Sequence, residues 1–378
     1  MELTKCKLGE LITQRREKND GSNLPICGVS KDGLIPPKQI DADTSIYNVF
    51  YRDDFIFNPA RMELNSIAIN DKYDRAICSS LYEVFFVHRT DLLLPHYLKL
   101  MVKQKWFTRY CEFLGQGSAR EYCRFNNISE IEIKFPSVEE QQRIVDYYSS
   151  IQKRIALKKQ INDNLEATAL AIYKSFFVDF EPFDFVQPES WKEVTLEDIA
   201  TEIICGKTPP TVNAENYGGN VPFITIPDMH GSVYTTSTER FLSEKGVATQ
   251  ANKTLPPNSI CVSCIASVGL VCLTAEPSQT NQQINSIVCK KNISPFYVYI
   301  KMSTLTDYLK QLGAGGSTTL NVNKTLFGQI PILLPDEIVM NEFHENVQPL
   351  FSAIRANQYE MQHLESLKSL LLTQISSR

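Results

Sequence analysis

The sequence lacks the features that would assign the protein to a membrane or to the secretory pathway. It contains no run of about eighteen apolar residues, which is the length that indicates a membrane-spanning helix. Residues 1–5 do not lead into the apolar core of a signal peptide. The ten cysteines are scattered without paired spacing, and free thiols are typical of a reducing compartment. We therefore expect a cytoplasmic protein that makes no contact with a membrane.

The sequence also lacks the motifs of enzymes that use a metal or modify DNA. A zinc site would need a second ligand pair beside Cys261-Val-Ser-Cys264, and none stands at metal-binding spacing, so buried free thiols are the better interpretation. Phe113-Leu-Gly-Gln-Gly117 has the form of a loop that binds S-adenosylmethionine, but it follows a predicted helix instead of a strand. Glu132-Ile-Lys134 lacks the upstream Pro-Asp of a nuclease. We predict no catalytic residues, no metal and no cofactor.

The charge balance limits the kind of nucleic-acid binder that the chain can be. Lysine and arginine number 38, aspartate and glutamate number 43, and the net charge is −5. This excludes a uniformly basic protein but allows local basic patches. The 378 residues, 43% of them hydrophobic, suffice for two or three domains with apolar cores.

Residues 137–177 are predicted to form one long helix because they contain neither glycine nor proline. Apolar residues recur there in alternating steps of four and three, with Lys158 and Asn162 in two polar positions. This spacing is typical of a coiled coil. Its apolar positions are Ile144, Tyr148, Ile151, Ile155, Leu165, Ile172 and Phe176. Ala169 occupies the position between Leu165 and Ile172.

The same pattern returns after 199 residues. Pro136 corresponds to Pro335 and Ile133 to Ile332, so the offset also extends upstream of the helix. A register kept over some eighty residues indicates an internal duplication. The second set of apolar positions is Phe343, Val347, Leu350, Ile354, Met361, Leu364, Leu371 and Ile375.

The predicted fold class is α+β, with two globular mixed α/β domains separated by two long antiparallel helices that form a coiled coil, and an internal pseudo-two-fold repeat. The expected segments are a domain at 1–136, a helix at 137–180, a domain at 181–336 whose first ten residues are a linker, and a helix at 337–378. Pairing of the helices would bury both apolar seams and place the domains at opposite ends of a rod. Lys158, Asn162 and Asn357 either fix the register of this seam or lie at its solvated edge.

A series of short motifs in the second half resembles a known family. Together with Pro335 before the last helix, they resemble the specificity subunit of type I restriction–modification systems, and the resemblance covers nearly the whole chain. The first half matches mainly through Gly115-Gln-Gly-Ser118 and the helix entry at Pro136. In order, the second-half motifs are Trp191-Lys-Glu-Val-Thr-Leu-Glu-Asp-Ile199, Gly206-Lys-Thr-Pro209, Tyr217-Gly-Gly-Asn-Val-Pro-Phe-Ile224, Thr280-Asn-Gln-Gln-Ile284 and Gly315-Gly-Ser-Thr-Thr319.

The resemblance implies a non-catalytic subunit in which each globular domain recognises one half of a bipartite, asymmetric sequence in double-stranded DNA. The helices would set the gap between the half-sites and provide the docking surface for two modification (methyltransferase) subunits, which the restriction subunit joins. The first half lacks a Gly-Lys-Thr-Pro and an Asn-Gln-Gln motif, so the two half-sites are expected to differ.

Candidate DNA-contact residues follow from the motifs and from the chemistry of readout, in which arginine, lysine and amides contact bases and small polar groups contact phosphates. For Asn281 and Gln282 the alternative is a buried amide network. The candidates are Arg15, Arg16, Lys31, Arg61, Ser118, Arg120 and Arg124 in the first domain, and Lys207, Thr208, Asn281, Gln282, Ser317, Thr318 and Thr319 in the second.

Two other classes of function stay open at this stage. A non-catalytic scaffold that binds only proteins through its coiled coil explains the helices equally well. It explains less well why both halves carry a Gly-Ser loop at matching positions. A DNA methyltransferase is the third interpretation, and it would require S-adenosylmethionine binding by this chain alone.

Overall fold

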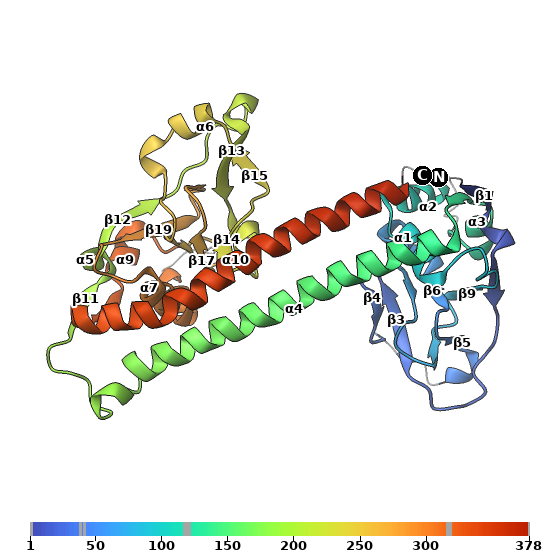
Figure 1. Cartoon of the computed structure of the whole chain (residues 1–378), viewed down its shortest axis with the longest axis horizontal. Helices are drawn as coiled ribbons and strands as arrows, with labels where there is room; N and C mark the ends of the chain where they lie inside the picture. Colours follow the sequence, from blue (N-terminus) through green and yellow to red (C-terminus); the bar gives the residue numbers. More distant parts are fainter. Residues whose placement is uncertain (1–2, 38–39, 41–42, 116–121, 315–319, 377–378) are drawn as a thin grey trace. The chain divides into compact units, whose positions relative to one another are not determined.

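A computed structural model describes residues 3–37, 40, 43–115, 122–314 and 320–376. The chain forms two compact units. Unit 1 comprises Met1–Lys153 together with Glu365–Arg378, and unit 2 comprises Arg154–Leu364. Unit 1 is therefore built from both ends of the chain, and both long helices contribute to both units (Figure 1).

Unit 1 contains two four-stranded sheets, with strand orders β2-β9-β6-β7 and β4-β3-β8-β5, and a separate antiparallel pair, β1 with β10. Its strands are β1 Thr4–Lys7, β2 Ile12–Arg15, β3 Ile26–Ser30, β4 Gly33–Ile35, β5 Asn48–Tyr51, β6 Phe55–Phe57, β7 Ile67–Ile69, β8 Arg75–Cys78, β9 Glu83–Val87 and β10 Glu132–Phe135. Its helices are α1 Pro95–Val102, α2 Lys105–Gly115 and α3 Phe125–Ser129, with the 3₁₀ segment η3 at Pro59–Leu64. Pro95 at the first helical position and Asn65 in the left-handed conformation after η3 mark these boundaries.

Unit 2 contains a five-stranded sheet of order β12-β19-β16-β17-β14, a three-stranded sheet of order β15-β13-β18, and the antiparallel pair β11 with β20. Its strands are β11 Lys192–Thr195, β12 Ala200–Cys205, β13 Tyr217–Ile224, β14 Tyr234–Thr235, β15 Arg240–Leu242, β16 Ile260–Ser263, β17 Val271–Thr274, β18 Gln279–Thr280, β19 Ile284–Cys289 and β20 Pro331–Leu334. Its short helices are α5 Leu196–Ile199, α6 Glu244–Ala248, α7 Pro295–Thr304, α8 Thr306–Gly313 and α9 Lys324–Gly328. The mixed α/β fold class predicted from the sequence is confirmed in both units.

The internal repeat is confirmed by the positions of corresponding elements. Helix α4 spans Val138–Phe177 and α10 spans Glu337–Ser376, so both ends differ by 199 residues. The same offset relates β10 to β20 and α3 to α9. Each long helix therefore follows the same succession of a short helix and an edge strand, which indicates that the two halves arose from one folding unit.

The long helices pair antiparallel in unit 2. Phe176 of α4 lies beside Phe343 of α10, with ring centroids 6.1 Å apart, whereas Asn162 lies beside Asn357. Residue numbers therefore decrease along α10 in the direction in which they increase along α4, as expected for antiparallel helices. In unit 1 the start of α4 shares a core with the end of α10, through Ile144 and Ile375.

All fifteen predicted apolar seam positions are buried or half-buried. They are Ile144, Tyr148, Ile151, Ile155, Leu165, Ile172 and Phe176 on α4, and Phe343, Val347, Leu350, Ile354, Met361, Leu364, Leu371 and Ile375 on α10. The exposed large apolar residues of the two helices lie off this seam, at Tyr147, Leu157, Ile161, Ile338, Leu367 and Leu370.

The long helices pack against the cores of the units as well as against each other. In unit 2, Tyr173 and Phe177 of α4 and Phe343 of α10 surround Tyr297 of α7 at centroid distances of 4.8–6.3 Å. Such aromatic clusters add to the free energy gained from apolar burial. None of the described helices is long and apolar enough to cross a membrane.

Candidate nucleic-acid interface

In unit 2 the residues that follow β12 turn back against the residues that precede β19. The Gly206 N–H donates to the Ile284 oxygen at 3.1 Å, and the Lys207 N–H donates to the Thr280 oxygen at 3.0 Å. A Cβ at residue 206 would lie 2.2 Å from the Asn281 backbone oxygen, so this approach requires glycine. The structure thus brings the Gly-Lys-Thr-Pro and Asn-Gln-Gln motifs into direct contact.

The polar side chains at this contact divide into an exposed set and a buried one. Thr208 Oγ1 donates to Gln282 Oε1 at 2.6 Å, which fixes the orientation of an exposed amide. Lys207 is exposed and makes no side-chain hydrogen bond or ion pair with the described residues. Asn281 is only 8% exposed and exchanges two hydrogen bonds of 3.1 Å with Gln283. Asn281 therefore belongs to an internal amide network.

A third segment meets the start of β19. Asn285 Nδ2 donates to the Val322 oxygen at 3.1 Å, and the Ala266 N–H donates to the Leu320 oxygen at 3.1 Å. Residues 320–322 therefore lie beside the strand that follows the Asn-Gln-Gln motif. The candidates Ser317, Thr318 and Thr319 directly precede this segment and lie outside the described residues.

Arg240 is a basic residue at this place that sequence reasoning missed. Its guanidinium lies 5.4 Å from the ring centroid of Phe223 and 6.0 Å from that of Tyr217. The Tyr217 hydroxyl in turn donates to the Pro209 oxygen at 2.8 Å, so Arg240 adjoins the loop that carries Lys207. In the sequence, only the aromatic Tyr217 within a motif pointed to this site. Arg240 reaches the site through the pairing of β13 with β15, which the sequence does not specify.

Unit 1 contains the equivalent arrangement, built from different residues. β2 pairs antiparallel with β9 as β12 pairs with β19. After β2, Arg16 Nε donates to Gln14 Oε1 at 2.9 Å, and Gln14 Nε2 donates to Glu83 Oε2 at 3.4 Å. Glu83, the first residue of β9, also pairs with Arg124 at 3.5 Å and accepts the Phe125 N–H at 2.7 Å. Arg16 and Arg124 therefore lie on one edge.

In each unit, then, three segments meet: the end of β2 or β12, the start of β9 or β19, and the residues just before the short helix α3 or α9. We call this place the contact edge. It is defined by Arg16, Glu83 and Arg124 in unit 1 and by Lys207, Thr208 and Gln282 in unit 2. The Arg124 guanidinium also lies 5.8 Å from the centroid of Tyr122, which is exposed.

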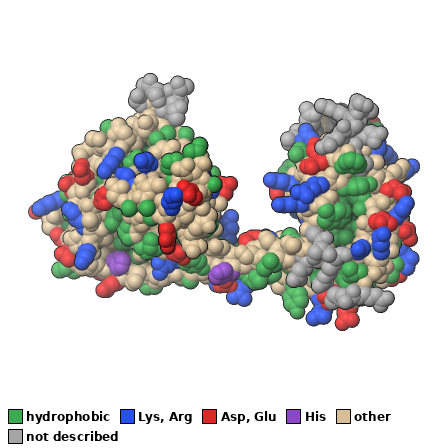
Figure 2. All heavy atoms as spheres, turned by 90° about the horizontal axis from the view of Figure 1, so that it is seen from above, with side chains coloured by type: hydrophobic (Ala, Val, Ile, Leu, Met, Phe, Trp, Pro, Cys, Tyr) green, Lys and Arg blue, Asp and Glu red, His purple; other side chains and the backbone are tan. Residues whose placement is uncertain are grey.

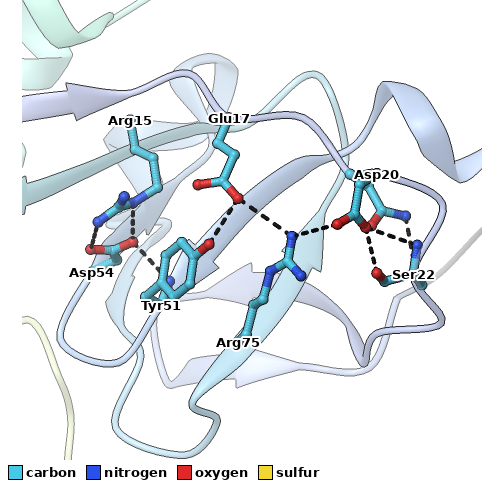
Figure 3. A network of polar contacts seen from close by, with 8 residues as sticks. Arg15, Glu17, Asp20, Ser22, Tyr51, Asp54 and Arg75 are labelled. Atoms are coloured by element: carbon cyan, nitrogen blue, oxygen red, sulfur yellow. Dashed lines mark hydrogen bonds and ion pairs between the residues drawn. The ribbon is translucent and has the colours of Figure 1, made fainter.

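Arg15, although adjacent to Arg16, is bound within the domain. Its Nε and Nη2 donate to the two carboxylate oxygens of Asp54 at 2.6 and 3.1 Å, and the carboxylate is 2% exposed (Figure 3). The guanidinium lies 4.7 Å from the Tyr51 ring and 4.6 Å from the Phe86 ring. Burial raises the pKa of Asp54, while the Arg15 hydrogen bond opposes this shift. Because two of its five N–H donors bind Asp54, Arg15 is held within the domain, and we do not include it among the proposed DNA contacts.

The same network fixes the chain on both sides of Arg16. The Tyr51 hydroxyl donates to Glu17 at 2.8 Å, and Arg75 bridges Glu17 and Asp20 at 3.4 and 3.3 Å (Figure 3). Hydrogen bonds from Ser22, with a smaller effect of Arg75, lower the pKa of Asp20 to about 2. The segment after β2 is therefore anchored on β5 and β8, which hold Arg16 in place.

Two other candidates of the first domain, Lys31 and Arg61, are not brought to the contact edge. Lys31 and Arg61 line a concave surface of about 600 Å³ elsewhere in unit 1. Ser118 and Arg120 lie outside the described residues.

The surface charge is mixed. Figure 2 shows basic side chains interspersed with acidic ones on the viewed face of each unit. Within the described part of the chain, no group of three or more His, Cys, Asp or Glu residues is arranged to hold a metal ion.

Comparison with known proteins identifies the class. A family model described as the type I restriction modification DNA specificity domain matches residues 9–167 and again residues 188–368. The chain is 31% identical over 377 residues to the type I restriction enzyme HindI specificity subunit of Haemophilus influenzae, covering 81% of this chain and 82% of the relative. It is 26% identical over 304 residues to the MjaIX specificity subunit of Methanocaldococcus jannaschii, covering 75% and 69%.

A solved structure shares the fold. The crystal structure of a type I restriction–modification system S subunit from M. genitalium matches with a TM-score of 0.64 at 15% identity, covering 99% of this chain and 96% of that one. Two tandem specificity domains, each followed by a long helix, define a two-domain DNA-specificity protein. The chain belongs to the family of type I restriction–modification specificity subunits, which recognise DNA and are not catalytic.

Proposed function

We propose that each unit recognises one half of a bipartite, asymmetric target in double-stranded DNA through its contact edge. The observation that carries this proposal is the recurrence of one edge geometry with different side chains in the two halves. A repeated scaffold supports equivalent positioning on the duplex, and the different side chains support different half-sites. In unit 1 the contacts are Arg16 and Arg124, and in unit 2 they are Lys207, Thr208 and Gln282, joined by Arg240.

The domain organisation is part of the proposal. The target-recognition domains are residues 1–136 and 181–336, and residues 137–180 and 337–378 form the helical spacer between half-sites. The spacer also docks two modification subunits, to which the restriction subunit binds. The off-seam apolar residues of the helices are exposed and therefore accessible to such a partner.

We also propose a cytoplasmic location for this complex. All ten cysteines are free, although Cys111 Sγ and Cys123 Sγ lie 3.4 Å apart. Unpaired neighbouring thiols are what a reducing compartment maintains.

The experiment begins with the target. Sequencing the methylated bases of the source cell gives a split motif, and the specificity subunit with its modification subunits is then titrated with that duplex at several salt concentrations. The logarithm of the affinity should fall linearly with the logarithm of the salt concentration. Arg16→Gln and Lys207→Gln should each reduce the slope by about one. A protein-binding scaffold would show neither the affinity nor the slope.

Matched controls stand at the opposite ends of the same strands. Arg89 follows β9 and Lys291 follows β19, and both are exposed. Arg89→Gln and Lys291→Gln should leave the slope unchanged. Equal loss in the control and contact variants would assign the effect to general charge and would contradict the contact edge.

Assignment of one half-site to each unit is tested by exchange. Replacing residues 1–136 with the corresponding domain of another family member should change one half of the methylated motif and leave the other half intact. Loss of both halves would show that the units do not read independently.

A further inference from the structure

A concave surface in unit 1 has the size of a small-molecule site and no role in the proposed duplex readout. It encloses about 600 Å³ between β3, the segment after β4, η3 and the turn before β9. Ligand sites in proteins usually enclose about 300–1,000 Å³. We call it the β3 pocket.

Two cations without protein partners line the β3 pocket. Lys31 and Arg61 are exposed, and neither side chain makes a hydrogen bond or ion pair with the described residues. Ser30 and Ser79 line the same surface. Arginine presents a planar fork of donors that suits phosphate, and lysine adds a point charge. This chemistry selects an anion with several acceptor oxygens.

Most of the rest of the lining is apolar or aromatic. Ile35 and the Tyr82 side chain contribute to the wall, and Leu64 and Leu81, which are 61% and 78% exposed, also line the surface. Exposed leucines beside a cationic concavity offer apolar contact in addition to charge. Aromatic side chains such as Tyr82 stack with nucleobases of any identity, because every base has a flat face.

A half-buried lysine holds two walls of the pocket together. Lys103 Nζ donates to the Lys31 oxygen at 2.6 Å, to Asn65 Oδ1 at 3.0 Å and to the Ile67 oxygen at 3.1 Å. Asn65 ends η3, the segment that carries Arg61. The two cation-bearing segments are thus tied to one ammonium group, so the pocket is preorganised and binding does not have to order it.

The β3 pocket adjoins the contact edge along the chain. Tyr82 lines the pocket, and the next residue, Glu83, is the centre of the unit 1 contact edge. We propose that the β3 pocket binds a nucleotide unit, with its phosphate between Lys31 and Arg61 and its base against the apolar wall. The nucleotide is either one turned out of a DNA strand or a free nucleotide. This inference goes beyond the proposed readout and does not depend on it.

The first experiment uses the full chain and free ligands. Isothermal titration is done with the four deoxynucleoside monophosphates, with the matching nucleosides and with inorganic phosphate. The monophosphates should bind saturably, and the nucleosides and phosphate at least about tenfold more weakly. Arg61→Gln and Lys31→Gln should each weaken binding about tenfold, whereas Arg89→Gln should not. Both contact residues are exposed, and thermal unfolding will verify that each variant is folded.

Four results would overturn the proposal. The first is the absence of nucleotide binding, and the second is undiminished binding in Arg61→Gln. The third is phosphate binding as tight as that of the nucleotides, which would leave an anion site without base recognition. Tighter binding of a poly-glutamate peptide than of any nucleotide would likewise overturn it in favour of a protein partner.

A second experiment distinguishes the two sources of the nucleotide. The complex is titrated with a target duplex that carries one bulged 2-aminopurine and with the fully paired duplex. For a nucleotide from DNA, Arg61→Gln should weaken binding of the bulged duplex only. For a free nucleotide, deoxynucleoside monophosphates should bind without competing with either duplex. Arg61→Gln should still bind the paired duplex. Binding of the paired duplex therefore tests the proposed readout, and nucleotide binding tests this inference, so one can fail without the other.

Discussion

Asn357 donates its side-chain amide to the side-chain oxygen of Asn162 at 2.8 Å, inside the seam between the two long helices. Asn357 Oδ1 also accepts from Lys158 Nζ at 2.8 Å, and Lys158 pairs with Glu360 at the same distance. Both asparagines are more than 90% buried. Of the two sequence-based alternatives for these polar positions, the structure supports the one in which they meet within the seam and specify its register.

Asn162→Leu should therefore destabilise the protein although it adds apolar surface. The Asn357 amide would lose its acceptor in a buried position, which costs about 1–3 kcal/mol. The double variant Asn162→Leu/Asn357→Leu should recover most of that loss, because both polar groups are then removed. Urea unfolding of the three proteins measures this. Equal stability of the single variant and the wild type would show that water reaches the Asn357 amide.

Gly206→Ala should disrupt the unit 2 contact edge. The added methyl would lie 2.2 Å from the Asn281 oxygen and 2.4 Å from the Thr280 oxygen, and backbone cannot yield as a flexible side chain can. We expect about 2–3 kcal/mol of destabilisation and loss of recognition of the unit 2 half-site. Gly328→Ala is the control, because its nearest atoms would lie at 3.6 Å and it stands on helix α9. Thermal unfolding of both variants measures the loss of stability, and methylation assays measure recognition of the unit 2 half-site.

Loss of the Arg15 ion pair should reduce stability, whereas loss of the neighbouring Arg16 should reduce DNA binding. Asp54→Ala leaves the half-buried Arg15 guanidinium and the Tyr51 N–H without their acceptor, which should cost about 3 kcal/mol in unfolding free energy. Arg16→Gln removes an exposed charge and should change stability by less than about 0.5 kcal/mol while lowering the salt dependence of DNA binding. If Arg16→Gln unfolds the domain, the residue is structural.

Lys103 should make stability rise with pH in the alkaline range. Burial lowers its pKa to about 8, with Asp32 raising it and Lys99 lowering it as smaller effects. The unfolded chain therefore holds more protons than the folded chain between about pH 8 and its ordinary value of 10.5, and unfolding free energy increases as pH rises through that window. Since the group is partly exposed, we expect a gain of about 2 kcal/mol.

The comparison is with Lys103→Met, whose unfolding free energy should lack this rise. Lys103→Met should also be less stable than the wild type at pH 9, because three carbonyl acceptors lose their donor. Lys105→Met, at an exposed position two residues away, should behave as the wild type. Parallel pH curves for the wild type and Lys103→Met would contradict the assignment.

The sequence sufficed to predict the helices, their pairing and the repeat, because each depends on local periodicity. A seam position such as Ile354 must recur at a fixed spacing for the helices to pair, so it can be recognised without knowing the partner. The offset of 199 residues, read from Pro136 and Pro335, reappears in the helix boundaries themselves.

The contact edge could be predicted only in part. Lys207 and Gln282 stand in motifs, but the hydrogen bond from Thr208 depends on strand pairing between distant segments. The same holds for Arg15, because no local pattern says that Asp54 will lie opposite it, and for Arg240, whose aromatic partners come from another strand. Strand register is a long-range property, and it decides which charges are free.

The last turns of α10 complete the core of unit 1, where Leu371 and Ile375 lie with Ile144 and Tyr148. During translation, the apolar surface of unit 1 therefore stays uncovered until α10 has been synthesised. A product that lacks the last turns of α10 would expose that surface to proteases and chaperones, so such a product should not accumulate in the cell.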